Sequence, residues 1–130
     1  MTKNYSKSRA AEARLTADDL HRMFLFDFAN GAIYRRKDNK RMDLLHFFRQ
    51  NSSQNVRYKQ VQMPVDGQYV KISAHRMIWC ASKGTWPAPD FDIDHINSDT
   101  LDNRLVNLEE VSERVNIVRG IRKKLARDRA

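Results

Sequence analysis

The sequence has very little cysteine: Cys80 is the only one among 130 residues. An internal disulfide is therefore excluded, and so is a zinc site built from several cysteines. Cys80 lies in the apolar run Met77-Ile78-Trp79-Cys80-Ala81. We therefore expect it to be a buried packing residue and not a nucleophile.

Long apolar runs are also missing. No stretch approaches the roughly 18 residues needed to cross a bilayer, and no apolar segment follows the charged N-terminus as a signal peptide would require. The sequence shows no internal repeats, and its 130 residues allow one small domain with or without arms. We expect a cytoplasmic protein with no membrane partner.

The basic residues are unevenly distributed. The formal net charge is +8, but residues 1–14 carry +3, residues 35–41 carry +4 and residues 119–130 carry +5, so the remainder is acidic. Basic segments on such a body suit a polyphosphate partner, because each neutralised phosphate releases condensed counterions. The same charges would also suit ends that are merely solvated, so the pattern favours DNA without establishing it.

The N-terminal half predicts a helix and a turn. Residues 1–14 lack apolar periodicity and are expected to form a basic flexible arm. Thr16-Ala17-Asp18-Asp19 fits a capping box, with Asp in place of the usual Glu, so a helix should begin there. Asn30-Gly31 predicts a turn that leads into a short strand. Residues 42–50 are apolar enough to be buried, but helix and strand are both open.

The middle of the chain predicts a loop, a hairpin and a helix. Residues 51–55 read as a loop. Apolar residues alternate on both sides of Asp66-Gly67, which is typical of a β-hairpin. Residues 75–83 look helical, and Gly84 should end that helix.

The C-terminal part predicts a strand, a long loop, a strand and a helix. The two strands are expected over residues 91–95 and 108–111, and the Asn- and Asp-rich loop over residues 96–107. Ser112 should cap the final helix, which is expected to run to about Leu125. Together these elements predict an α+β fold.

Four polar residues of this part have the composition of a hydrolytic metal site. Asp94 and His95 are adjacent, Asn107 follows Asp94 by thirteen residues, and Asn116 follows by nine more. His95 suits a general base because imidazole titrates near neutral pH. Asp94 suits a hard ion such as Mg²⁺ or Mn²⁺, and Asn116 offers a neutral oxygen. Neighbouring residues of a strand point to opposite faces, so Asp94 and His95 need a twist or a strand end to share one site.

The stretch resembles the HNH endonuclease family, the small metal-dependent nucleases common among phage homing enzymes. The resemblance covers roughly residues 15–119, and its departures are Ser98, where Gly is usual, and Arg119, where a further Asn often follows. The matching segments are Leu15–Arg36, which is similar to the helix, Asp, Gly and aromatic strand at the start of phage HNH proteins, and His75-Arg76-Met77-Ile78-Trp79, Gly84-Thr85-Trp86-Pro87, Asp94-His95-Ile96-Asn97, Asp102-Asn103-Arg104 and Asn107-Leu108.

The resemblance implies a C-terminal ββα-metal (HNH) finger that cleaves DNA phosphodiester bonds. His95 would be the general base, and Asn107 would tie the loop and orient that base. Asp94 and Asn116 would hold one divalent ion, Mg²⁺ in preference to Mn²⁺, with no small-molecule cofactor. His75 and Asn103 are expected to support the site from beside it, without binding the ion.

We expect four parts: a basic flexible arm (1–14), a DNA-contacting α+β region (15–74), an HNH nuclease core (75–120) and a basic tail (121–130). DNA is the expected partner, a monomer is favoured with a dimer left open, and a phage gene would place the protein in the bacterial cytoplasm. The expected DNA contacts are Arg35, Arg36, Lys37, Lys40, Arg41, Arg104, Arg119, Arg122, Lys123 and Lys124.

Two alternatives to an independent nuclease stay open. The chain could bind DNA or regulate it without cutting, or it could cut only inside a larger complex. Sequence specificity and the choice between nicking and double-strand cleavage are not readable, since no recognition helix stands out.

Overall fold

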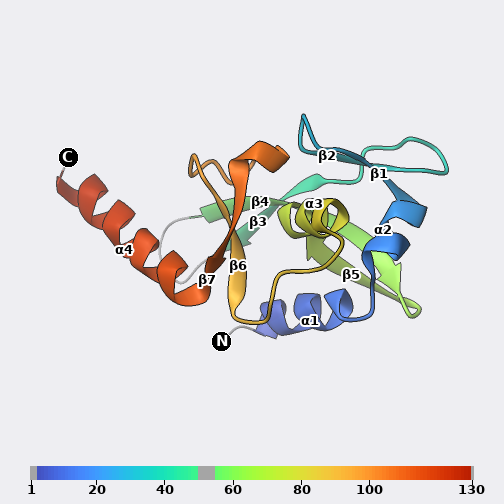
Figure 1. Ribbon diagram of the computed structural model, residues 1–130, viewed down its shortest axis with the longest axis horizontal. Helices are drawn as coiled ribbons and strands as arrows, with labels where there is room; N and C mark the ends of the chain where they lie inside the picture. Colours follow the sequence, from blue (N-terminus) through green and yellow to red (C-terminus); the bar gives the residue numbers. More distant parts are fainter. Residues whose placement is uncertain (1–2, 50–54, 130) are drawn as a thin grey trace.

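A computed structural model describes residues 3–49 and 55–129, which form an α+β fold of antiparallel sheets and helices (Figure 1). The expected fold class is confirmed. The helices are α1 (Lys3–Glu12), α2 (Ala17–Met23), α3 (Ala74–Lys83) and α4 (Glu113–Arg129). The strands are β1 (Phe24–Asp27), β2 (Ala32–Arg35), β3 (Leu44–Arg49), β4 (Asn55–Val65), β5 (Gln68–Ser73), β6 (Phe91–His95) and β7 (Leu108–Ser112). None of the helices in these two ranges is long and apolar enough to span a membrane.

The expected flexible arm is wrong, because α1 occupies most of residues 1–14. This helix lies along β5 (Figure 1). Its last residue, Glu12, is buried and accepts two hydrogen bonds from the Arg76 guanidinium of α3, from Nε at 2.7 Å and from Nη2 at 2.9 Å. Arg9 adds an ion pair of 2.8 Å with Asp92 of β6. Polar contacts with distant residues hold the helix in place. Its sequence therefore lacks the apolar periodicity from which a helix could have been predicted.

The second helix begins as predicted. The Thr16 hydroxyl accepts a hydrogen bond from the Asp19 N–H at 3.1 Å, and the Asp19 carboxylate accepts one from the Thr16 N–H at 2.9 Å, so the capping box is complete. Strand β1 begins directly after Met23 and pairs with β2 up to Asp27 and Ala32. The turn between them ends at Gly31, whose φ of 69° is readily adopted by glycine.

Strands β3, β4 and β5 form the largest sheet, and β3 settles the open choice over residues 42–50 in favour of a strand. Residues 50–54 of the expected loop lie outside the described residues, and Asn55 already belongs to β4. The Asp66-Gly67 hairpin is confirmed, with positive φ at both residues and Val65 paired with Gln68.

Helix α3 packs against this sheet and forms much of the core. Cys80 is fully buried, as expected, and burial raises the pKa of its thiol to about 12. Such a thiol carries no useful thiolate fraction at neutral pH, so Cys80 is not a nucleophile. The core residues of the sheet and α3 include Val61, Met63, Ile72, Met77, Ile78 and Cys80.

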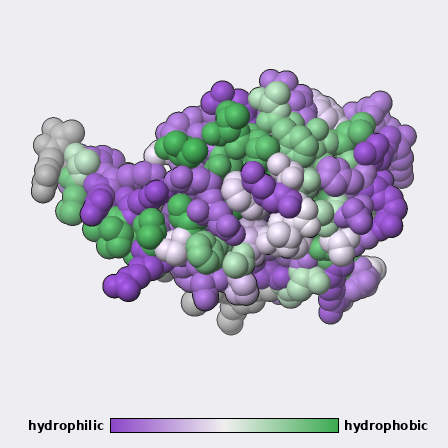
Figure 2. Space-filling model, in the orientation of Figure 1, coloured by the Kyte–Doolittle hydropathy of each residue, from purple (hydrophilic) through white to green (hydrophobic). Residues whose placement is uncertain are grey.

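The strand, loop, strand and helix predicted for the C-terminal part are present as β6, the 96–107 loop, β7 and α4. Ser112 caps α4 by accepting a hydrogen bond from the Val115 N–H at 3.1 Å. The helix continues to Arg129, so the expected basic tail over residues 121–130 is helical in its described part. It projects from the body (Figure 1), and its surface mixes apolar and polar residues (Figure 2).

The Glu12–Arg76 pair gives a stability prediction. Replacing Glu12 with Ala removes the hydrogen-bonded counter-ion of the buried Arg76 guanidinium and leaves only Asp92, 4.0 Å away, so the free energy of unfolding should fall by about 3–5 kcal/mol. Urea unfolding followed by circular dichroism measures this fall. The control is Arg14→Ala, which breaks an exposed pair with Asp66 and should cost less than about 1 kcal/mol. Similar losses in the two variants would contradict the prediction.

Candidate active site

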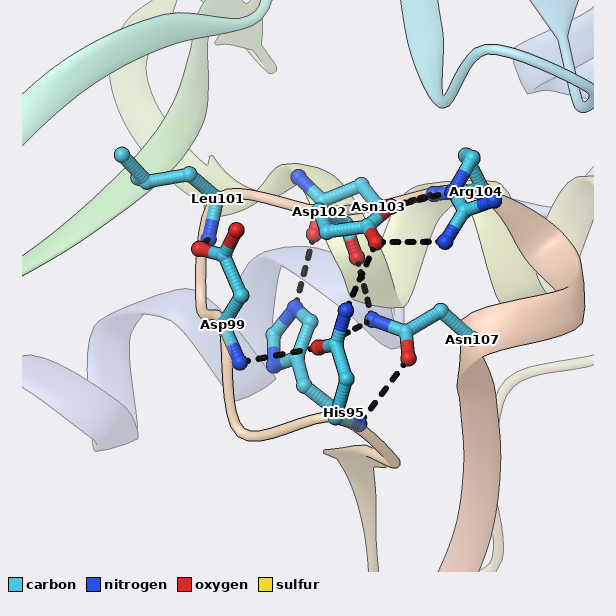
Figure 3. A network of polar contacts seen from close by, with 8 residues as sticks. His95, Asp99, Leu101, Asp102, Asn103, Arg104 and Asn107 are labelled. Carbon is cyan, nitrogen blue, oxygen red and sulfur yellow. Dashed lines mark hydrogen bonds and ion pairs between the residues drawn. The ribbon is translucent and has the colours of Figure 1, made fainter.

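The 96–107 loop leaves β6 and returns to β7 with its ends joined. The Ile96 N–H donates to the Asn107 carbonyl oxygen at 2.8 Å, and His95 pairs with Leu108 where the strands meet. The Asn107 side chain ties the loop internally (Figure 3): its Oδ1 accepts from the Asn97 N–H at 3.0 Å, and its Nδ2 donates to Asn97 Oδ1 at 2.9 Å and to the Asp102 carbonyl at 2.8 Å. These bonds fix the loop that faces His95.

His95 lies at the end of β6 with only 4% of its surface exposed. Its Nε2 lies 2.7 Å from Oδ1 of Asn103, a residue of the same loop (Figure 3). A carbonyl oxygen can only accept, so Nε2 carries the ring proton and Nδ1 keeps a free lone pair. A neutral imidazole in this tautomer can take a proton through Nδ1.

The residue that orients the His95 ring is therefore Asn103, and not Asn107 as the resemblance implied. In the described part of the chain, the Asn107 side chain makes no hydrogen bond with the His95 ring, and it acts on the loop instead. Asn103 is 2% exposed, and its Nδ2 has no hydrogen-bond partner among the described residues. Sequence reasoning placed Asn103 beside the site but could not tell which amide reaches the ring.

Asp94 lies next to His95, and its carboxylate bends back to accept the His95 N–H at 3.0 Å. Its other oxygen accepts from Nη1 of Arg119 on α4 at 3.2 Å. The same Nη1 also donates to Glu109, which pairs with Asp94 across the β6–β7 ladder. Arg119 was expected to contact DNA, yet it bridges two carboxylates here. Sequence reasoning missed Glu109, which only the strand register brings to this place.

Asn116 lies on α4, three residues before Arg119 and hence on the same face of the helix, and it is half-buried. Asp94 and Asn116 offer carboxylate and amide oxygens, which suit a hard divalent ion that keeps several waters. The described residues contain no cluster of three or more His, Cys, Asp or Glu side chains that could hold a metal. The Asp94 carboxylate instead faces the Arg119 guanidinium, so an ion held by Asp94 would have to share or displace this partner.

His75, at the start of α3, lies against the His95 ring. The ring centroids are 4.9 Å apart, and Tyr58 of β4 lies 6.1 Å from His75 on the sheet side. Burial lowers the pKa of His75 well below its usual value, and the charges of His95, Arg76 and Arg9 lower it further. His75 is thus a neutral neighbour of His95 at pH 7.

The expected DNA-contacting residues fall in three places: the end of β2 with the segment that follows it, the 96–107 loop and α4. Arg35 and Arg41 pair with Asp38 and Asp43, both at 2.5 Å, and Arg104 pairs with Asp102 at 2.8 Å. These guanidinium groups are already partly neutralised. The Arg36 Nε donates to the His21 carbonyl oxygen at 2.5 Å. The exposed residues of the set include Lys37, Lys40, Arg122, Lys123 and Lys124.

Comparison with known proteins gives a family for this part of the chain. Residues 73–118 match the family model described as HNH endonuclease, and this segment contains Asp94, His95, Asn107 and Asn116. This segment of the chain is therefore similar to HNH endonucleases.

The fold is also similar to a solved structure reported as "DNA binding and cleavage by the HNH homing endonuclease I-HmuI", with a TM-score of 0.55 and 17% sequence identity. The match covers 78% of this chain and 53% of that one, so this chain spans about half the length of its structural neighbour. A search of curated proteins found no match.

The lowered pKa of His75 predicts acid sensitivity. The unfolded chain binds a proton at His75 near pH 6.5, whereas the folded protein does so only at lower pH. Stability contributed by this residue is therefore complete above pH 6.5 and falls below it, by at most about 1.4 kcal/mol per pH unit. Urea unfolding at pH 7, 6 and 5 should show a smaller loss for His75→Gln than for the wild type. His21→Gln is the control, since the His21 ring contacts the Ala81 carbonyl oxygen near the end of α3 opposite His75. Equal dependence of stability on pH in all three proteins would contradict the prediction.

Proposed function

We propose that the chain is a metal-dependent endonuclease that hydrolyses phosphodiester bonds of DNA. The observation that carries this proposal is a histidine with a defined tautomer beside an aspartate at the end of β6, inside the segment that matches the HNH endonuclease family. The structural neighbour is described as binding and cleaving DNA, which supports the same substrate class here.

In this proposal His95 removes a proton from the attacking water. The Asn103 carbonyl oxygen holds Nε2–H, so the ring presents Nδ1 as the basic nitrogen and the imidazolium that forms stays hydrogen-bonded. Asn107 keeps the loop closed around this pair. His75 packs on the ring and is neutral, so it adds no positive charge that would weaken the base.

Asp94 and Asn116 would hold the divalent ion, with Mg²⁺ preferred to Mn²⁺. When bound, the ion would stabilise the leaving oxygen and the charge on phosphorus. The exposed basic residues of α4 and of the segment between β2 and β3 would contact the phosphate backbone without reading sequence.

Purified protein should nick or cut supercoiled plasmid in the presence of Mg²⁺, and EDTA should abolish the reaction. Replacing His95 with Ala should slow it by about 10²–10⁴-fold, which is the usual contribution of a general base. Gel separation of supercoiled, nicked and linear DNA measures both effects and distinguishes single-strand from double-strand cleavage.

His21→Gln is the matched histidine control and should cleave like the wild type. Full activity of His95→Ala would refute the assigned base. Plasmid binding without strand breakage under either Mg²⁺ or Mn²⁺ would favour the non-cleaving alternative, and activity that appears only after adding a cell extract would favour a module of a larger complex.

The Arg119 bridge makes a separate prediction about metal affinity. An ion that binds Asp94 must compete with the Arg119 guanidinium, so Arg119→Ala should bind Mn²⁺ more tightly than the wild type in the absence of DNA. Partly exposed ion pairs are worth up to about 1 kcal/mol, so the dissociation constant should fall by up to about fivefold. Isothermal titration with Mn²⁺ measures the change. Arg122→Ala removes an exposed charge from the same helix, and an equal effect in that control would show that Arg119 does not compete.

A further inference from the structure

The turn between β1 and β2 lies directly against the loop that carries Asn103. Gly31, the last residue of the turn, has no room for a side chain: an added Cβ would lie 2.7 Å from the Asn103 carbonyl oxygen and closer still to Asn103 C and Arg104 N. All three atoms belong to the backbone, which cannot move aside as a flexible side chain would. Gly31 is thus needed here for its size as well as for its φ of 69°.

A hydrogen bond also joins the β1–β2 turn to the 96–107 loop at Leu105, the residue after Arg104. The Leu105 N–H donates to the Phe28 carbonyl oxygen at 3.0 Å, where residues 105–107 form a short 3₁₀ helix. The turn therefore touches the loop at Asn103 and Arg104 and bonds it at Leu105. Asn103 is held on its backbone side by the turn, and its side chain reaches the His95 ring.

We propose that the β1–β2 turn is part of the catalytic unit, with Gly31 and Asn103 as positioning residues for His95. This inference rests on the proposed function, in which His95 is the base. The turn lies well outside residues 73–118, the segment that matches the HNH family. The N-terminal region would then do more than contact DNA, because it sets where the Asn103 amide stands.

The tolerance of this arrangement is small. Ordinary contact begins at 3.4 Å, so a methyl group at residue 31 forces the Asn103 backbone away from the turn. The Asn103–His95 bond is 2.7 Å long and both residues are buried, so a shift of the Asn103 backbone acts directly on this bond. Displacements of about 1 Å in groups that position a catalytic residue can cost about 10²-fold in rate.

The chain offers a matched control for Gly31→Ala. Gly67, in the β4–β5 turn, also has a positive φ, 83°, but an added Cβ there meets nothing within 4 Å. Both Ala variants carry the same kind of backbone strain, and only Gly31→Ala pushes on the active-site loop. The difference between the two variants therefore isolates the contact.

The first measurement uses metal-free protein without DNA. Two-dimensional ¹⁵N NMR of the imidazole nitrogens, assigned by the signal lost in His95→Gln, reports which nitrogen of His95 carries the proton. We expect Nε2–H in the wild type and in Gly67→Ala. Gly31→Ala and Asn103→Ala should both show a mixture of tautomers. Because no cleavage is involved, this result stands or falls independently of the nuclease proposal.

The second measurement is Mg²⁺-dependent plasmid cleavage by the same variants. In Gly31→Ala, kcat should fall by about 10²-fold with little change in KM, while Gly67→Ala keeps the wild-type values. Adding Gly31→Ala to Asn103→Ala should cost little more, since the glycine acts through the amide. A folded Gly31→Ala variant with wild-type tautomer and kcat would overturn the inference.

A second pair of variants decides the matter if Gly31→Ala does not fold. Leu105→Pro removes the N–H that bonds Phe28, at the first residue of the 3₁₀ helix, and Arg104 before it has extended angles that accept a following proline. Leu105→Ala shortens the side chain but keeps the N–H. A change in the His95 tautomer in Leu105→Pro alone would support the inference, and equal spectra in the two variants would overturn it.

Discussion

The hydrogen bond between His95 and Asn103 is the contact on which the site depends. It decides which imidazole nitrogen is basic, and it joins the end of β6 to a loop that is otherwise irregular. Asn107 closes that loop through three hydrogen bonds, and Gly31 leaves room for its backbone on the other side. Two hairpins that are distant in the sequence, β1–β2 and β6–β7, therefore both support this single buried amide.

Several arginine residues are paired with acidic side chains. Arg35, Arg41 and Arg104 each pair with a neighbouring acid, so the exposed basic residues include Lys37, Lys40 and those of the outer half of α4. Arg119 differs because its two carboxylates belong to opposite strands of the β6–β7 hairpin. One guanidinium thus links α4 to the hairpin and balances the negative charge of Asp94. Anchoring and charge balance are combined in the same contact.

Local signals in the sequence were reliable, and long-range polar contacts were not readable. The Thr16 capping box, the Asp66-Gly67 hairpin and the Ser112 cap each depend on a few adjacent residues, and each was predicted. The succession of strand, loop, strand and helix followed from the same kind of pattern. Helix α1 was missed because a buried ion pair with Arg76, and not an apolar face, holds it.

The residue types of the site could likewise be predicted from the sequence, but the hydrogen bonds between them could not. Asp94, His95 and the nearby amides stand out by their spacing, whereas the choice of Asn103 over Asn107 as the partner of the ring depends on how the loop folds back. Glu109 enters only through the strand register, and Gly31 only through a close approach between segments that are distant in sequence.

The Glu12–Arg76 pair has a consequence for dissecting the protein. Arg76 follows His75, whose ring lies on His95, so the N-terminal helix supplies the counter-ion one residue away from the catalytic neighbourhood. A fragment that contains only residues 73–118 would keep the Arg76 guanidinium and Asp92 but lose the two hydrogen bonds from Glu12. A fragment meant to represent the folded protein should therefore begin upstream of Glu12.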